Sequence, residues 1–176
     1  MRTTIHWIAL PAVAVGVACP AWAVTYLSIE QAQQAIFPQA RLQKIGVQLT
    51  PDQRKAIEKS SGVKVRAIKF DVWKVEGGGW FLVDEVVGKH EFITFALGLN
   101  PDGSVKQIEV MDYRENYGGE VRRPEWRAQF AGKKPGSKLK LDEDIKSISG
   151  ATLSCRHLTE GVKRLLATYD IALKDK

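Results

Sequence analysis

Small and hydroxyl-bearing residues gather between Ser147 and Ser154, in the stretch Ser-Ile-Ser-Gly-Ala-Thr-Leu-Ser. Apolar residues at helical spacing follow it, so this stretch is expected to form a turn that leads into a helix. Such a turn offers backbone N–H groups and the positive end of the helix dipole to an anion. Gly150 and Ala151 leave space beside the turn, and Thr152 places a hydroxyl at the helix start. Phosphate is therefore the first ligand that this stretch predicts.

A second candidate segment runs from Tyr113 to Glu120 and combines aromatic, charged and glycine residues. Gly118 and Gly119 permit positive φ and a close approach of the backbone to a ligand. Tyr113 and Tyr117 can line a planar ring, and Arg114 can meet a phosphate or another anion. A glycine turn flanked by surface charges explains the same residues about equally well, so the residue types alone leave both interpretations open.

A third candidate is the turn from Gly88 to Glu91, between two expected strands. His90 would need an orienting partner to act as a general base, and the sequence shows none, so a structural or solvated histidine is the simpler interpretation. Cys155 and His157 are two residues apart in the last helix and point to different sides, so with His90 they do not make a metal site. The chain also has no Gly-x-Ser-x-Gly nucleophile elbow, which argues against a hydrolase.

The elements that must position these segments follow from caps and periodicity. Two capping boxes, Ser28 with Gln31 and Thr50 with Gln53, predict that the first third of the chain is helical and packs over a sheet. Alternating or apolar runs separated by glycine-rich turns predict four strands, and helical spacing predicts a C-terminal helix. The strands are expected at residues 63–76, 80–87, 92–97 and 105–113. The predicted fold class is α+β, an antiparallel β-sheet meander packed by N-terminal helices and a C-terminal helix. The aromatic turn at residues 126–130 is expected to close the core.

These features together resemble the FMN-binding domain of bacterial electron-transfer proteins. That family includes the flavin-carrying subunits of sodium-pumping quinone reductases and of Rnf-type complexes, and small periplasmic FMN-binding proteins. The resemblance covers about residues 65–166 and rests on the Ser-Gly-Ala-Thr stretch, the Gly-Lys-His turn and the Tyr-Arg-Glu segment with its Gly-Gly-Glu ending. It implies that Thr152 carries FMN through a phosphoester bond installed by a separate flavin transferase. The other cofactor-binding residues that it implies are Ser149, Gly150, Ala151, Leu153, Ser154, Lys89, His90, Tyr113, Arg114, Glu115, Gly118 and Gly119.

The chain departs from the family pattern at one position. The transferase recognition motif has an Asp six residues before the Thr, and this chain has Lys146 there, with Asp144 and Asp142 nearby. One of these carboxylates can substitute if the loop shifts, or FMN can bind without a covalent bond. The resemblance favours an electron carrier over a stand-alone enzyme, relaying electrons between a membrane-associated donor and another redox partner. A binding or assembly module without redox function is the alternative.

The N-terminus has the pattern of an export signal. A basic start, an apolar run and the small-x-small sequence Ala21-Trp22-Ala23 predict a cleavable signal peptide over residues 1–23 and a periplasmic protein. The apolar run is shorter than the about 20 residues that span a bilayer, which disfavours a retained anchor. Pro20 and Gly16 disfavour a lipoprotein cleavage site at Cys19.

Residues 24–176 are expected to form a single FMN-binding domain, with its core at about residues 65–170. Cleavage leaves Cys155 alone, so no internal disulfide is expected and packing must supply the stability. The net charge of +6 is spread among alternating acidic and basic residues, so no nucleic-acid partner is predicted. The oligomeric state is not readable from the sequence.

Overall fold

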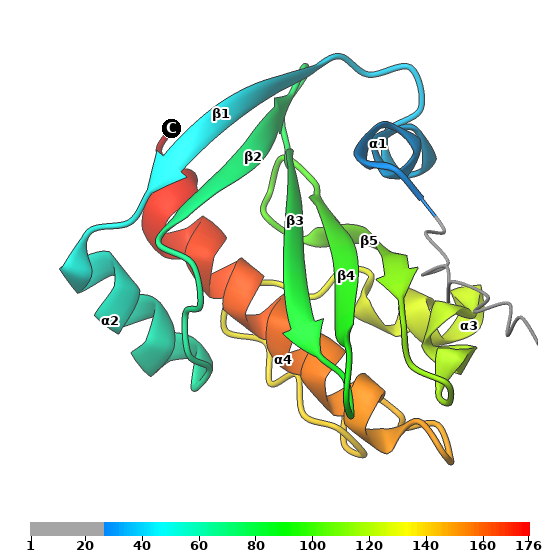
Figure 1. The fold of residues 1–176 in the computed structure, drawn as a ribbon. Helices are drawn as coiled ribbons and strands as arrows, with labels where there is room; N and C mark the ends of the chain where they lie inside the picture. The colour runs from blue at the N-terminus through cyan, green and yellow to red at the C-terminus, as the bar shows by residue number, and fades with distance from the viewer. Residues whose placement is uncertain (1–26) are drawn as a thin grey trace, which may run out of the picture.

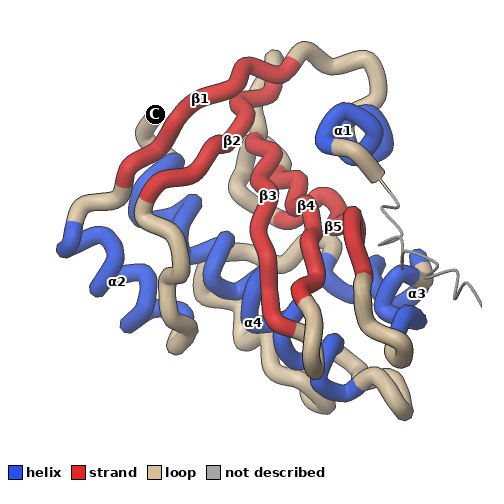
Figure 2. The backbone as a smooth tube through the Cα atoms, in the orientation of Figure 1, coloured by secondary structure: helices blue, strands red, loops and turns tan. Residues whose placement is uncertain are grey.

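The computed structural model describes residues 27–176, so the expected signal peptide and Cys19 lie outside the described residues. One antiparallel sheet with strand order β1-β2-β3-β4-β5 organises the described part (Figures 1 and 2). Its strands are β1 (Leu42–Gln48), β2 (Lys69–Val75), β3 (Trp80–Val87), β4 (Phe92–Leu99) and β5 (Val105–Tyr113). The α-helices are α1 (Ile29–Ile36), α2 (Pro51–Ser61), α3 (Pro124–Arg127) and α4 (Thr152–Thr168). Shorter helical turns are η1 (Gly119–Arg122), η2 (Ala128–Phe130) and η3 (Tyr169–Leu173). The α+β prediction is confirmed.

The two faces of the sheet are covered by different helices, α4 on one and α1 on the other (Figure 1). Glycines allow both helices to approach closely. A Cβ on Gly161 of α4 would lie 2.7 Å from Val86 Cγ1 and 2.9 Å from Phe95 Cζ. On the opposite face, a Cβ on Gly98 would lie 3.0 Å from a Phe37 ring carbon. The helix that begins at the candidate phosphate-binding turn is therefore seated directly on the central strands.

An ion pair fixes the position of α4 along β3. Arg164 Nη2 and Nε donate to Asp84 Oδ2 at 2.6 and 3.1 Å, and the guanidinium also donates to the carbonyl oxygens of Lys64 and Glu85. Burial raises the pKa of Asp84, and the Arg164 guanidinium offsets only part of this effect. The guanidinium thus joins the C-terminal half of α4 to β3 and to the segment before β2.

The expectation that the first third is helical is wrong for Leu42–Gln48, which forms β1. This strand pairs only with β2, and Val47 is the one residue in it that is fully buried. An edge strand with so little buried surface does not need the regular alternation from which strands are recognised, and Gly46 interrupts the pattern further. Both capping boxes are confirmed, at the starts of α1 and α2.

Strand boundaries agree closely for β3 and β5 and differ for β2 and β4. The expected strand at residues 63–76 begins only at Lys69. Val65 N–H donates instead to Glu58 Oε1 of α2 at 2.9 Å, so a helix rather than a neighbouring strand holds this residue. β4 continues two residues beyond the predicted end, to Leu99. Trp126 and Phe130 are buried in the core as expected. Among the described residues, no helix is long and apolar enough to cross a membrane.

Candidate functional site

Thr152 is the first residue of α4 and is exposed, as is Leu153, whereas Ser154 is buried. Gly150 has φ +83° with open space around it, and Ala151 precedes the helix without a side-chain cap. The first N–H groups of a helix have no acceptor within the helix itself. The Thr152 hydroxyl therefore stands at the surface beside N–H groups that can bind an anion.

The loop before this turn is anchored by a neighbouring helix. Trp126 Nε1 donates to Lys146 O at 2.8 Å, and Lys146 N–H donates to Gln129 Oε1 at 2.7 Å. The backbone of Lys146 is thus held on both sides, while its side chain is exposed. Trp126 is buried, so core packing fixes the path by which the chain reaches Thr152.

The two acidic residues near Lys146 have different surroundings. Asp144 accepts hydrogen bonds from Lys140 N at 2.6 Å and from Leu139 N and Lys133 Nζ at 3.1 Å. Burial acts to raise the pKa of Asp144, but these hydrogen bonds outweigh it and the pKa lies below the usual range. Asp142 is exposed and accepts from Ser147 Oγ at 2.5 Å and Ser147 N at 3.2 Å. Asp144 therefore binds backbone and side-chain donors of its own loop, and Asp142 binds Ser147, two residues before the Ser-Gly-Ala-Thr stretch.

A hydroxyl network joins the first and second candidate segments. Tyr113 Oη donates to Tyr117 O at 2.5 Å and lies 3.0 Å from Ser154 Oγ. A phenol has one O–H, so Ser154 is the donor in the second contact. Burial raises the pKa of Tyr113, whose side chain belongs to the core cluster. Tyr113 and Ser154 thus hold the second segment against the first turn of α4.

Gly118 completes this contact because no side chain fits there. Its φ is +87°, and a Cβ would lie 2.7 Å from Tyr113 Oη and 3.2 Å from Ala151 Cβ. The positive φ that the sequence allows is present, and the group that the Gly118 backbone approaches is Ala151, the residue before Thr152.

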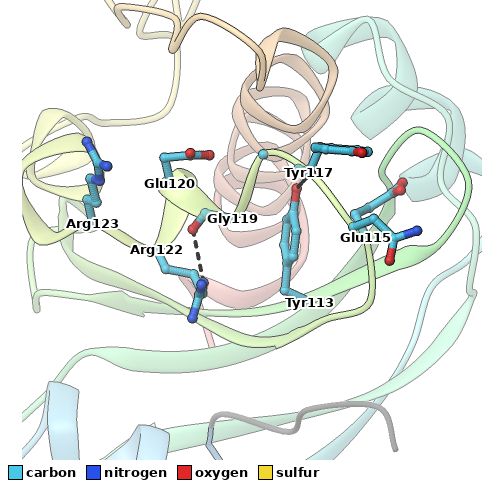
Figure 3. A pocket seen from close by; sticks show the side chains of 9 residues that line it. Tyr113, Glu115, Tyr117, Gly119, Glu120, Arg122 and Arg123 are labelled. Atoms are coloured by element: carbon cyan, nitrogen blue, oxygen red, sulfur yellow. Dashed lines mark hydrogen bonds between the residues drawn. The ribbon is translucent and has the colours of Figure 1, made fainter. Parts of the chain in front are cut away.

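The second segment lines an open pocket of about 690 Å³, shown in Figure 3. Tyr117 stands at one side of it, 85% exposed, and Arg122 Nε donates to Gly119 O at 2.9 Å. The lining residues are Tyr113, Glu115, Asn116, Tyr117, Gly118, Gly119, Glu120, Arg122 and Arg123. Thr152 does not line the pocket, but the contact of Gly118 with Ala151 places the two next to each other.

The third segment is tied to the second through Glu115. Its Oε1 accepts from His90 N at 2.5 Å and from Glu91 N at 3.1 Å. A Cβ on Gly88 would lie 2.5 Å from the same oxygen, so Glu115 occupies the space that a side chain there would need. Burial acts to raise the pKa of Glu115, but these backbone hydrogen bonds outweigh it and lower the pKa.

Some residues expected at the site lie away from the pocket. The side chains of Lys89 and His90 are exposed, and the contact of His90 with Glu115 is made by its backbone. Arg114 Nε donates to Asp112 Oδ2 at 2.8 Å, and Arg114 does not line the pocket. Across residues 27–176, no group of three or more His, Cys, Asp or Glu side chains is arranged to hold a metal ion.

One residue of interest, Arg156, was not identified from the sequence. Arg156 is exposed one helical turn after Thr152, on the same side of α4, and it makes no ion pair with any described residue. Thr152 and Arg156 are four residues apart in a predicted helix, and this spacing could have identified Arg156 as a neighbour of Thr152. Tyr117 belongs to the second candidate segment, whose tyrosines were expected to line a planar ring, but the sequence did not distinguish the buried Tyr113 from the exposed Tyr117.

Residues 88–167 match the family model of the FMN-binding domain. This part of the chain belongs to the FMN-binding domain family. The match begins at Gly88 and ends within α4, so the FMN-binding domain contains all three candidate segments.

A solved structure, that of NqrC from Shewanella oneidensis, is similar, with a TM-score of 0.51 and 20% sequence identity. The similarity covers 80% of this chain and 82% of that chain and shows a shared fold. A comparison with curated proteins found no match.

Proposed function

We propose that the FMN-binding domain holds FMN through a phosphoester on Thr152 Oγ1 and acts as a periplasmic electron carrier. The observation that carries the proposal is the exposed Thr152 hydroxyl at the start of α4, next to the Gly118–Ala151 contact that borders the pocket. The family match supplies the identity of the ligand.

The residues present fit the two ends of FMN. At the phosphate end, the first N–H groups of α4 and the Arg156 guanidinium provide positive charge beside Thr152. Ser154 donates to Tyr113, so it supports the turn rather than binding the phosphate. At the other end, the pocket beside Gly118 offers room for a planar ring.

FMN and the protein have different roles when the cofactor is bound at this site. Bound FMN supplies a ring that takes up one or two electrons. The chain holds that ring beside α4 and fixes its surroundings through the Tyr113–Ser154 contact. A covalent bond keeps the cofactor attached outside the cytoplasm, where free FMN is scarce. The partners that this function needs are a flavin transferase, a membrane-associated donor and a second redox protein.

Intact-mass analysis of the exported protein, co-expressed with a flavin transferase, tests the proposal. The wild type should gain the mass of FMN minus water, and Thr152→Ala should gain none. Thr152→Ser keeps a hydroxyl at the same position and should still be modified, which separates loss of the nucleophilic oxygen from damage to the turn. An adduct that persists in Thr152→Ala would overturn the assignment of Thr152.

Lys146, at the place of the motif Asp, favours a second candidate, FMN bound without a phosphoester. In that case the native protein would show flavin absorbance, and acid denaturation followed by filtration would release all of the flavin. Under the first proposal the flavin stays with the polypeptide.

A further inference from the structure

We propose that Tyr117 supplies the aromatic surface against which the isoalloxazine ring packs. This inference rests on the proposed function and names a ring-contacting residue of the same site.

Tyr113 is not available for this role. Its side chain is 4% exposed and packs in the core cluster that also contains Ile93, Val110 and Leu158. Its hydroxyl is committed to Tyr117 O and Ser154 Oγ. A ring could reach the face of Tyr113 only by displacing these contacts.

Tyr117 has the opposite combination of a fixed backbone and a free ring. Its carbonyl oxygen accepts the Tyr113 hydrogen bond at 2.5 Å, and Gly118 after it is packed against Ala151. Tyr117 is 85% exposed, and its ring stands at the side of the pocket, next to the Tyr113 hydroxyl (Figure 3). The core therefore determines where Tyr117 stands without covering its faces.

The distribution of exposed apolar groups points to the same place. Five large apolar side chains are exposed among the described residues: Ile68, Val87, Phe92, Tyr117 and Leu153. Tyr117 and Leu153 are the two that belong to the candidate segments, and both are close in sequence to the Gly118–Ala151 contact. An exposed aromatic face in one segment and an exposed aliphatic side chain in the other suit a flat, largely apolar ring whose phosphate is held at the start of α4.

Flavin fluorescence of the loaded, full-length protein tests this inference. A phenol packed on the ring quenches its emission by donating an electron to the excited state, which a phenyl or aliphatic group does far less readily. Tyr117→Phe and Tyr117→Leu should both raise the emission per bound flavin severalfold. Tyr117→Phe should keep the visible circular dichroism bands of the ring, because a phenyl group still packs on it, whereas Tyr117→Leu should weaken them.

The control is Phe92→Leu, which removes an exposed aromatic ring that lines no part of the pocket and should leave both signals unchanged. Intact mass, measured on the same samples, reports loading separately. If the wild type carries FMN and the Tyr117 variants emit as it does, Tyr117 does not contact the ring and the inference is wrong while the proposed function stands. That result would also be expected if Tyr117 served to dock a partner protein. If the wild type carries no flavin, both fail.

Discussion

Gly118 shows how much of this site depends on the absence of a side chain. Its positive φ and its neighbours on both sides exclude a Cβ, and those neighbours come from β5 and from the turn before α4. The sequence predicted a close approach at this position. It could not say that the approaching group is Ala151, because the two are distant in sequence and are brought together only by the folded sheet and helix.

Gly118→Ala should therefore destabilise the protein more than a glycine substitution that meets only backbone strain. Positive φ costs an Ala about 1–2 kcal/mol, and the crowding adds about 1–3 kcal/mol. Gly132→Ala is the matched control, since Gly132 has φ +75° with nothing within 4 Å. Denaturant unfolding should show the larger loss for Gly118→Ala, and FMN loading should fall in that variant alone. Equal losses in the free energy of unfolding would mean that the loop around Gly118 can shift to accept a Cβ with little loss of stability.

The loop before α4 gives Asp142 and Asp144 different hydrogen-bond partners. The sequence offered Asp142 and Asp144 equally as replacements for the motif carboxylate at Lys146. Their hydrogen bonds distinguish them. Asp144 accepts from the backbone of its own loop, whereas Asp142 accepts from Ser147. Such partners depend on the turn geometry, including φ +64° at Asp142, which no residue pattern indicated.

Asp142→Asn should slow covalent loading with little effect on stability. Asn still accepts the hydrogen bonds from Ser147, so the turn is kept and only the negative charge is lost. The measurement is the rate of the FMN mass increase with a flavin transferase. Asp144→Asn is the comparison, and loading per folded molecule should be unchanged in it. If loading is slowed in Asp144→Asn and unchanged in Asp142→Asn, Asp144 is the residue that the transferase needs.

Asp144→Asn should also reduce the sensitivity of the fold to acid. The pKa of Asp144 is lowered in the folded state, so its stabilising contribution is present above the ordinary Asp pKa of about 3.9 and is lost as pH falls through the lower folded value. The free energy of unfolding of the variant should therefore be lower than that of the wild type at pH 7, and the difference should shrink below pH about 4. A difference that does not change with pH would show that the charge of Asp144 contributes nothing.

The ion pair between α4 and β3 allows a double-mutant test of how the helix is seated. Asp84→Asn leaves the buried Arg164 guanidinium without its counter-charge and should cost about 3–5 kcal/mol in the free energy of unfolding. Replacing both residues, with Asp84→Leu and Arg164→Met, removes the charge and should recover most of that loss. If the loss of stability in the double variant equals the sum of the losses in Asp84→Leu alone and Arg164→Met alone, the pair does not act as a unit.

For the whole molecule, the sequence predicted the sheet, its meander order and the C-terminal helix, because turns and buried periodic runs are local signals. It missed β1, whose pairing with β2 depends on a partner about 27 residues away rather than on its own pattern. Each of the three candidate segments could be recognised from the sequence, but the contacts between them could not. These are the Tyr113, Gly118 and Glu115 contacts, which exist only once β5 and α4 are in place.

The start of the described part, at Leu27, also bears on export, which we propose on the pattern of residues 1–23. The first described residue already belongs to the fold, since Leu27 N–H donates to Met111 O of β5 at 3.2 Å and Ser28 caps α1. Cleavage after Ala23 would keep all of these contacts. N-terminal sequencing of the protein from a periplasmic extract should therefore begin at Val24, and its unfolding midpoint should equal that of residues 24–176 expressed without the leader. Replacing Ala21 and Ala23 with Leu should block processing and leave the longer chain membrane-bound, whereas a full-length chain recovered in the cytoplasm would show that these residues are not an export signal.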